Sequence, residues 1–174
     1  MITIAIVEDD KEYRSQYRDY LKQMEAQMGE SFQIREFEDG DGILENYRAD
    51  YDIILMDIEM SFVNGMEAAE EIRKLDHEVV IIFITNMPQY VMEGYKVQAF
   101  DYILKPASPE EILETCRRAT LQIRQETEAC QLPSVHMAVL EREAREMREK
   151  EPDSEGKINV REINLSLIHI SEPT

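Results

Sequence analysis

The sequence has no tryptophan, only two cysteines among its 174 residues, and no long apolar run. No stretch approaches the roughly 18 consecutive apolar residues of a membrane-spanning helix. The opening MITIAIVEDD lacks the basic, apolar and small-residue segments of a signal peptide, so we expect a cytoplasmic protein with no membrane partner. Cys116 and Cys130 have no metal-ligating neighbours at suitable spacing, and we interpret both as ordinary buried or half-buried thiols.

Positive charge is also scarce. The chain has 19 Lys and Arg against 37 Asp and Glu, which gives a net charge of -18. Phosphate contacts need clustered basic residues, so the composition argues against a chain that grips a nucleic acid backbone by itself. The 43% of hydrophobic residues can supply one core, and the length fits one domain plus an extension.

Short strand-like runs recur along the chain and alternate with segments of helical periodicity. The runs are ITIAIV (2–7), FQIREF (32–37), YDIILM (51–56), VVIIFI (79–84) and AFDYIL (99–104). This alternation predicts an α/β fold with a doubly wound, five-stranded parallel sheet and helices on both faces. We expect the flavodoxin-like order 2-1-3-4-5, with the alternating run 32–37 at an edge.

Two helices can be predicted in detail. The first has an apolar stripe at three- and four-residue steps: Tyr13, Tyr17, Leu21, Met24 and Met28. The last begins with Ser108 as N-cap and proline at the first helical position, followed by acids in the first turn. Its inner stripe is Ile112, Cys116, Ala119 and Ile123.

Asp57 ends the nearly continuous apolar run 53–56, and a charge at the rim of a core is costly unless it is paired. Other polar residues follow the remaining central strands: Glu8, Asp9 and Asp10; Thr85 and Asn86; Lys105 and Pro106. Singly, each fits a helix cap, a turn or a loop. Because the carboxyl ends of parallel strands share one edge of a sheet, we expect them to form one site.

Crowded carboxylates resist ionising together unless a cation neutralises them, and Mg²⁺ suits a site of carboxylates, a carbonyl and water. The central carboxylate, Asp57, can then attack phosphorus as a nucleophile, while Thr85 and Lys105 hold the phosphoryl oxygens. The residue types therefore indicate phosphoryl-group chemistry with Mg²⁺ as cofactor.

The strings IAIVEDD, DIILMDIEM, NGME, VVIIFIT and AFDYILKP resemble the receiver domain of two-component response regulators, over residues 1–125. The resemblance implies these roles: Asp57 as phosphoacceptor, Glu8 and Asp9 as metal-holding acids, the Glu59 backbone carbonyl as a further metal ligand, Thr85 and Tyr102 as the switch pair, and Lys105 as the phosphate-binding lysine. It also implies a cis bond before Pro106 and a sensor histidine kinase as partner. Such a protein is not an enzyme beyond intrinsic autophosphorylation and autodephosphorylation.

The resemblance further implies how a signal is passed on. Thr85 would move toward phosphorylated Asp57, and Tyr102 would turn inward. The face made by the fourth helix, the fifth strand and the fifth helix would then change its affinity for a partner or a second copy. Two departures from the family pattern concern this region: Ser61 stands where proline is usual, and Asn86 where a very small residue is commonest. We expect a less rigid loop and an altered acyl phosphate lifetime.

The segment NMPQY at 86–90 is most similar to regulators with a LytTR-type DNA-binding domain, the LytR/AgrA-like group. We interpret residues 126–156 as a helical extension or linker, and KINVREIN (157–164) as the start of a truncated LytTR-type domain. LSLIHISEPT (165–174) resembles a translated sequencing adapter. The native protein is therefore expected to continue, and to contact DNA only through the missing C-terminal domain.

Three other interpretations remain open from the residues. A flavodoxin-type enzyme would need a glycine- and hydroxyl-rich loop after the first strand, where this chain has EDDKEYR. A phosphatase with an aspartyl nucleophile would need a second acid soon after the first, and Glu59 lies two residues on. A free-standing receiver would act only by binding other proteins.

Overall fold

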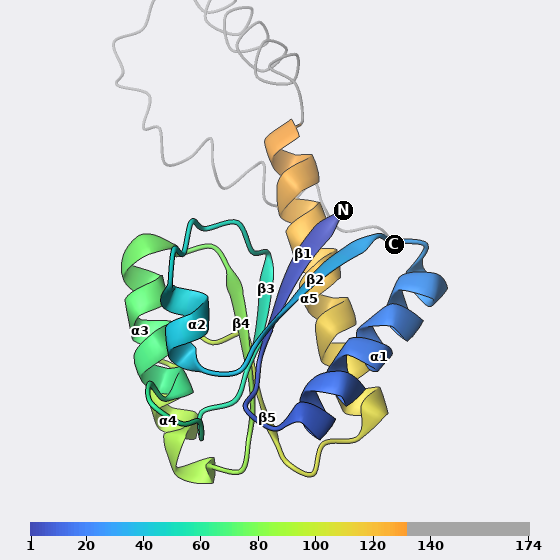
Figure 1. Cartoon of the computed structure of the whole chain (residues 1–174). Coiled ribbons are helices and arrows are strands. Elements are labelled where there is room, and N and C mark those ends of the chain that lie inside the picture. The colour runs from blue at the N-terminus through green and yellow to red at the C-terminus, as the bar shows by residue number, and fades with distance from the viewer. Residues whose placement is uncertain (132–174) are drawn as a thin grey trace, which may run out of the picture. The chain divides into compact units, whose positions relative to one another are not determined.

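Five parallel strands form one sheet in the order β2-β1-β3-β4-β5 (Figure 1). The computed structural model describes residues 1–131. The strands are β1 (Ile2–Val7), β2 (Phe32–Phe37), β3 (Ile53–Met56), β4 (Val80–Thr85) and β5 (Asp101–Leu104). Their number, order and parallel pairing confirm the expected flavodoxin-like α/β fold.

Three predicted strand boundaries differ by one or two residues. Strand β3 starts at Ile53 rather than residue 51, and the Asp52 carboxylate just before it accepts the Thr3 amide at 2.7 Å. Strand β4 is shifted by one residue, and the Val79 amide donates instead to the Asp76 carboxylate at 3.0 Å. Strand β5 starts two residues late, because Ala99 still closes the preceding turn through the Gly94 carbonyl at 3.0 Å.

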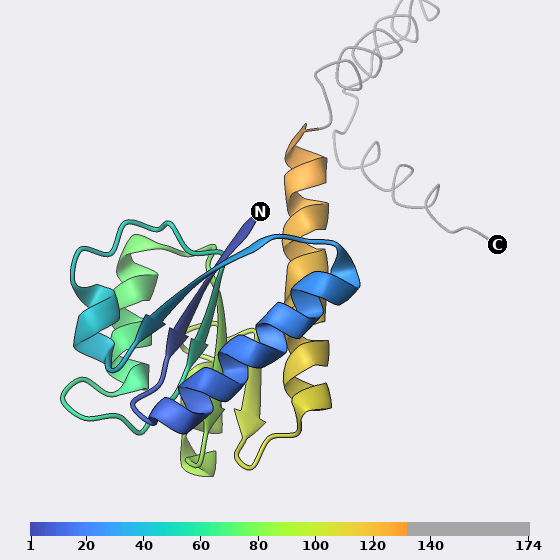
Figure 2. The same ribbon diagram turned by 45° about the vertical axis from the view of Figure 1, so that its right-hand side comes forward.

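Helices connect the strands and cover both faces of the sheet. They are α1 (Lys11–Met28), α2 (Gly40–Leu44), α3 (Gly65–Leu75), the 3₁₀ turn η1 (Pro88–Tyr90), α4 (Val91–Gly94) and α5 (Pro109–Gln131). Figures 1 and 2 show α1 and α5 on one face and α2, α3 and α4 on the other. None of the helices described for residues 1–131 is long and apolar enough to cross a membrane.

The predicted helix stripes are confirmed as core. On α1, Tyr17, Leu21 and Met24 are buried. On α5, Ile112, Cys116 and Ala119 are buried, and the Ser108 hydroxyl accepts the Glu111 amide at 3.1 Å as the expected cap. All these side chains pack in one cluster with the alternate residues of β1, β3 and β4 that point to this face.

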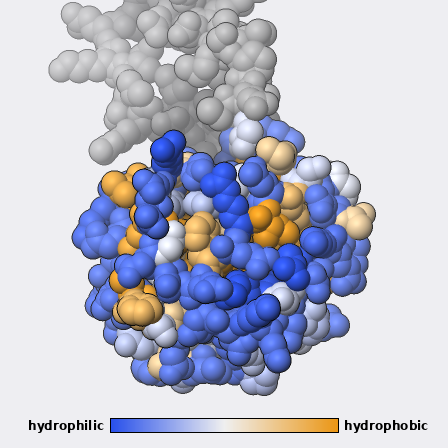
Figure 3. All heavy atoms as spheres, viewed as in Figure 1, coloured by the Kyte–Doolittle hydropathy of each residue, from blue (hydrophilic) through white to orange (hydrophobic). Residues whose placement is uncertain are grey.

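The second cluster lies under α2 and α3. It contains the other alternate residues of the central strands, among them Ile54, Met56 and Phe83, together with Ala68 and Ile72 of α3. Strand β2 lies at the edge, as predicted, and alternates between half-buried and exposed residues up to Arg35, after which Glu36 is exposed as well. The face in Figure 3 is mostly hydrophilic, in keeping with the net charge of -18, and hydrophobic residues show there only in limited areas.

Helix α5 continues past residue 125, the predicted end of the receiver domain, to Gln131. The predictions of a linker up to residue 156, a domain start at 157–164 and an adapter at 165–174 fall on residues outside the described part. The side chain of Cys130 is also outside it.

Burial makes Cys116 a sensitive probe of this fold. Its thiol is completely buried between α5 and the sheet, and burial raises the pKa of the thiol to about 12. Only the thiolate reacts with alkylating reagents. At about pH 9, above the ordinary thiol pKa, we expect iodoacetamide to label folded Cys116 far more slowly than the same residue in urea.

A Cys130→Ser variant leaves Cys116 as the only thiol for this measurement. The unfolded chain ionises near the ordinary thiol pKa, so the stability linked to this thiol is present below that value and is lost as the pH rises toward 12. Equal labelling rates in buffer and in urea, followed by mass spectrometry, would contradict the described packing of α5.

Candidate functional site

The candidate site lies at the carboxyl end of the sheet, where the backbone pairing continues past the strand ends. The Asp57 amide donates to the Val7 carbonyl at 2.9 Å, and the Lys105 amide donates to the Thr85 carbonyl at 2.9 Å. The Glu8 amide donates to the Phe37 carbonyl of β2 at 3.1 Å. These bonds fix the backbone positions of the residues that carry the acids and the lysine.

The centre of the site is an ammonium group between two buried carboxylates. Lys105 Nζ lies 2.6 Å from Asp57 Oδ2 and 2.9 Å from Glu8 Oε2. The three side chains are 4%, 5% and 1% exposed, respectively. Charges this deeply buried are tolerated only when they are paired and hydrogen-bonded. Sequence reasoning therefore placed Asp57, Glu8 and Lys105 together correctly.

Burial and neighbouring charges shift the pKa values of Glu8 and Lys105. Burial raises the pKa of Glu8 to about 7, the Asp57 charge adds to this effect, and the hydrogen bond from Lys105 opposes it. Burial by itself would lower the pKa of Lys105, but its hydrogen bonds to Asp57 and Glu8 raise it above the ordinary value. Lys105 therefore stays charged, and the site has a surplus of negative charge for a further cation.

Glu8, Asp9 and Asp57 can each offer one carboxylate oxygen such that these oxygens all lie within 4.8 Å of one another. Glu8 and Asp57 are buried, whereas Asp9 is exposed, so the cluster reaches solvent on the side of Asp9. An all-oxygen set of this kind fits Mg²⁺. The Glu59 amide donates to Asp57 Oδ1 at 3.1 Å, which places the loop after β3 beside the same carboxylate. The role of the Glu59 carbonyl stays a prediction.

Asp10 is a helix cap and not a member of the acidic site. Its carboxylate caps α1 by accepting the amides of Glu12 and Tyr13 at 2.7 and 3.3 Å. It therefore does not belong to the acidic cluster of Glu8, Asp9 and Asp57, although it follows Glu8 and Asp9 directly in the sequence. An acid at an N-cap is stabilised by the free amides of the first helical turn.

Thr85 and Tyr102 both hold the backbone of Met87. The buried Thr85 hydroxyl accepts the Met87 amide at 3.3 Å, and the Tyr102 hydroxyl donates to the Met87 carbonyl. Burial raises the pKa of Tyr102 to about 12, so this hydroxyl keeps its proton at neutral pH. The predicted switch pair is thus linked through one intervening residue, which the sequence did not indicate. The Lys105–Pro106 bond is cis, as predicted.

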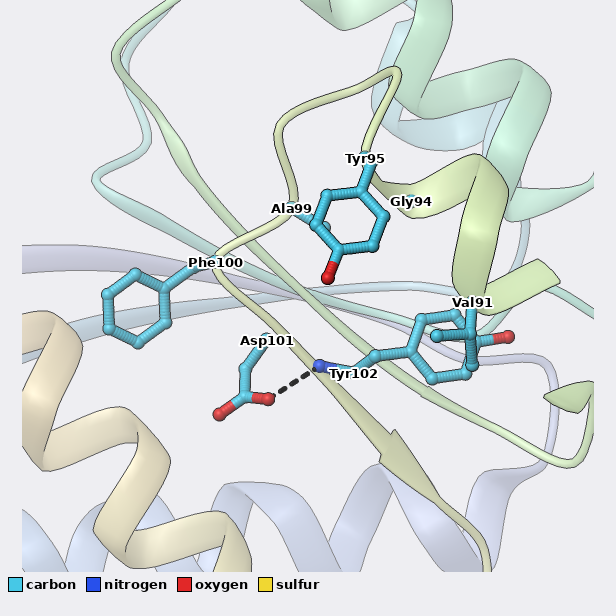
Figure 4. A pocket seen from close by; sticks show the side chains of 7 residues that line it. All are labelled: Val91, Gly94, Tyr95, Ala99, Phe100, Asp101 and Tyr102. Atoms are coloured by element: carbon cyan, nitrogen blue, oxygen red, sulfur yellow. Dashed lines mark hydrogen bonds between the residues drawn. The ribbon is translucent and has the colours of Figure 1, made fainter.

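Tyr102 also lines a cavity of about 310 Å³ between α4 and β5. Figure 4 shows the side chains around it: Val91, Gly94, Tyr95, Ala99, Phe100, Asp101 and Tyr102. Tyr95 follows α4 directly and is 77% exposed. The cavity therefore lies on the predicted output face, away from the acidic cluster.

Arg14 is a site residue that sequence reasoning missed. It is only 7% exposed, although it is an arginine on α1. Its guanidinium donates to the carbonyls of Glu8 at 2.5 Å and Asp9 at 3.4 Å, and it pairs with Glu38 at 2.9 Å. Arg14 therefore fixes the loop that carries two of the acids. The three- and seven-residue spacing from Arg14 to Tyr17 and Leu21 was the available signal, but a charged residue does not suggest burial.

Gly65 is a second missed residue. It opens α3, and a Cβ atom at this position would lie 1.9 Å from the backbone oxygen of Asp57. The Gly65 amide donates to the Ile58 carbonyl at 3.0 Å, and Asn64 caps the helix. Only glycine allows α3 to begin this close to Asp57. The NGME motif contains this glycine, but the motif alone does not reveal how closely the helix approaches Asp57.

A five-stranded parallel sheet of this order, with a lysine and three acids gathered at its carboxyl edge, fits the α/β domain of the receiver type that the sequence predicted. Residues 4–117 match the family model described as the response regulator receiver domain. The chain belongs to that family, and the predicted receiver resemblance is confirmed.

Curated relatives include proteins named LytT and LytR, in agreement with the predicted resemblance to LytR/AgrA-like regulators. The sensory transduction protein LytT of Bacillus cereus is 30% identical over 131 residues, which cover 74% of this chain and 51% of LytT. LytT of Oceanobacillus iheyensis is 36% identical over 112 residues, covering 63% of this chain and 44% of that protein. The chain thus spans about half the length of the curated relatives it matches.

Solved structures agree as well. The response regulatory domain of protein mrkE from Klebsiella pneumoniae has a TM-score of 0.64 and 26% identity, covering 71% of this chain and 99% of that one. The response regulator TrrA of Thermotoga maritima, in complex with Mg²⁺ and BeF, has a TM-score of 0.60 and 27% identity, covering 68% and 99%.

Arg14 and Arg18 offer a matched comparison on one helix. We expect Arg14→Ala to lower the free energy of unfolding by about 2 kcal/mol, because the buried carbonyl of Glu8 and the part-buried carbonyl of Asp9 lose their donor. Arg18 forms an ion pair too, with Glu36, but the Arg18 side chain is 36% exposed. Arg18→Ala should therefore lower the free energy of unfolding by less than about 1 kcal/mol. Urea denaturation measures both values, and equal losses would contradict the role of Arg14.

Proposed function

We propose that this chain is the phospho-accepting receiver of a two-component response regulator, and that Asp57 takes a phosphoryl group from a phosphohistidine of a sensor histidine kinase. One observation carries the proposal: a buried carboxylate at the end of a central strand lies 2.6 Å from a lysine ammonium, next to two further acids. Family membership adds to it. A cytoplasmic location stays a prediction.

In the proposed reaction, a carboxylate oxygen of Asp57 attacks phosphorus. A P–O bond forms, the P–N bond to the kinase histidine breaks, and the released imidazole takes up a proton. The Lys105 ammonium, already at the Asp57 carboxylate, neutralises the phosphoryl oxygens as they arrive. Bound Mg²⁺, with Glu8, Asp9, Asp57 and the Glu59 carbonyl as ligands, would neutralise further negative charge.

The proposed switch starts at Thr85. When its hydroxyl turns toward the phosphoryl group on Asp57, it no longer accepts the Met87 amide. The Met87 carbonyl still accepts the Tyr102 hydroxyl and the Tyr90 amide, whereas the Met87 amide loses its side-chain partner. A local change of charge at Asp57 thereby alters the segment that leads into α4. Asn86 is exposed between the two bonded residues, which supports an effect on the lifetime of the acyl phosphate.

The proposed output surface is the face of α4, β5 and α5. Large apolar side chains are exposed there: Val91, Met92, Tyr95, Leu104 and Leu121. Exposed apolar groups gathered on one face indicate an interaction site. We propose that phosphorylation changes self-association through this face, as a shift between two states of the surface.

The phosphoacceptor assignment has a direct test. Incubated with Mg²⁺ and labelled acetyl phosphate, the parent should take up label and Asp57→Asn should take up none above background, since an amide is not a nucleophile at phosphorus. Asp50→Asn is the matched control, because Asp50 is exposed and, among residues 1–131, its side chain is paired with Arg35 alone. Equal labelling of the parent and Asp57→Asn would overturn the assignment.

Self-association can be tested with beryllofluoride as the phosphoryl mimic. In sedimentation velocity with Mg²⁺, the parent should sediment faster after beryllofluoride is added, and Tyr95→Lys should not, because it puts a charge on the output face. Leu75→Lys is the control, since Leu75 is 67% exposed at the end of α3, outside that face. No change in the parent, or equal effects of both variants, would count against the proposal.

Two forms of output remain as candidates. We favour a transcriptional regulator with a LytTR-type DNA-binding domain beyond this chain, because curated relatives named LytT are about twice as long as the matched region. The alternative is a free-standing receiver that acts only by protein-protein interaction. Sequencing the intact gene downstream of residue 164 distinguishes them, and a stop codon there would exclude the first.

A further inference from the structure

The ammonium of Lys105 has a third neighbour besides the two carboxylates. Lys105 Nζ lies 4.4 Å from the centre of the Tyr13 ring, on its face. Tyr13 belongs to α1, whereas Lys105 follows β5, so the contact joins two elements on either side of the acidic cluster. The lysine side chain is 4% exposed, so the ring and the acids together leave little room for water.

The ring is itself held in place from two directions. The Tyr13 amide donates to the Asp10 carboxylate at 3.3 Å in the N-cap of α1. The ring stacks on that of Tyr17, with centres 6.0 Å apart and planes 25° apart, and Tyr17 is buried. The position of Tyr13 is therefore set by the start of the helix and by the core, and not by Lys105 alone.

An aromatic face attracts a cation through its quadrupole, and the attraction is larger where water is excluded. It differs from a third carboxylate in two respects. It adds no negative charge to a site where Glu8 and Asp57 already repel each other, and it offers no oxygen that competes for the N–H donors of Lys105. The ring thus restricts the ammonium while leaving its donors available for oxygen ligands.

We propose that Tyr13 is a positioning residue for Lys105: its ring holds the ammonium against Asp57, so that the donors are in place when phosphoryl oxygens arrive. This inference rests on the proposed function. Without the ring, the ammonium gains water and conformational freedom, both of which are lost again when the phosphoryl group binds. The contact is with the ring face, which phenylalanine also has.

The test compares four variants of the full chain. Tyr13→Phe keeps the ring, whereas Tyr13→Leu and Tyr13→Met keep apolar volume without it. Tyr20→Leu is the matched control, because Tyr20 is half-buried in the same core cluster but lies seven residues further along α1, about 10 Å away. Calorimetry gives the affinity for Mg²⁺ alone and for beryllofluoride at saturating Mg²⁺. NMR gives the chemical shift of the Lys105 ε-methylene protons, which a ring face moves upfield.

We expect Tyr13→Leu and Tyr13→Met to weaken beryllofluoride binding about tenfold, which corresponds to about 1.4 kcal/mol, with a smaller change in Mg²⁺ affinity. Tyr13→Phe and Tyr20→Leu should match the parent. The upfield shift of Lys105 should persist in Tyr13→Phe and vanish in the two variants without a ring.

Parent-like beryllofluoride binding by Tyr13→Leu or Tyr13→Met would overturn the proposal. An equal loss in Tyr20→Leu would also overturn it, because that loss would reflect general packing of α1. A loss in Tyr13→Phe would assign the effect to the hydroxyl instead. If the parent itself does not bind beryllofluoride, the proposed function fails. The chemical shift of the Lys105 ε-methylene protons then tests the contact between Tyr13 and Lys105 by itself. The absence of an upfield shift in the parent refutes the positioning role, and an upfield shift that depends on the ring supports it.

Discussion

The ion pair network of Lys105 with Asp57 and Glu8 is the interaction on which the site depends. Lys105 lies 48 positions after Asp57 and 97 positions after Glu8 in the sequence, and the three residues follow three different strands. Neither carboxylate is tolerable as an unpaired charge at this depth, and their mutual repulsion raises the pKa of Glu8 further. The Lys105 ammonium therefore holds Glu8 and Asp57 together, and the acidic cluster can still attract a second cation.

The acidic side of this network has more fixed contacts than the side that carries Thr85 and Tyr102. On the acidic side, Arg14 holds the loop after β1, and Gly65 lets α3 start in contact with the backbone of Asp57. On the switch side, Met87 is held by two side-chain hydrogen bonds, and α4 has only four residues. Short helices depend on tertiary contacts for their stability. This contrast fits a domain in which the acids stay in place while the neighbouring surface responds.

Two aromatic residues near the site have unusual surroundings. In the loop after β3, Phe62 has a left-handed φ of 69° and is 88% exposed. A bulky residue in that conformation is strained, and its aromatic side chain is in contact with solvent beside the site. Tyr13 is the other, since its ring face lies 4.4 Å from Lys105 Nζ.

The sequence by itself determined the sheet order, the core stripes and the meeting of Asp57, Glu8 and Lys105, because periodicity and strand-end positions follow from local residue patterns. It could not show that Asp10 caps a helix, that Arg14 is buried, or that Thr85 and Tyr102 meet at Met87. Those outcomes depend on distances between elements remote in the sequence and on competition for hydrogen bonds. Only the tertiary structure decided them, because residue type does not reveal which of several partners a polar group selects.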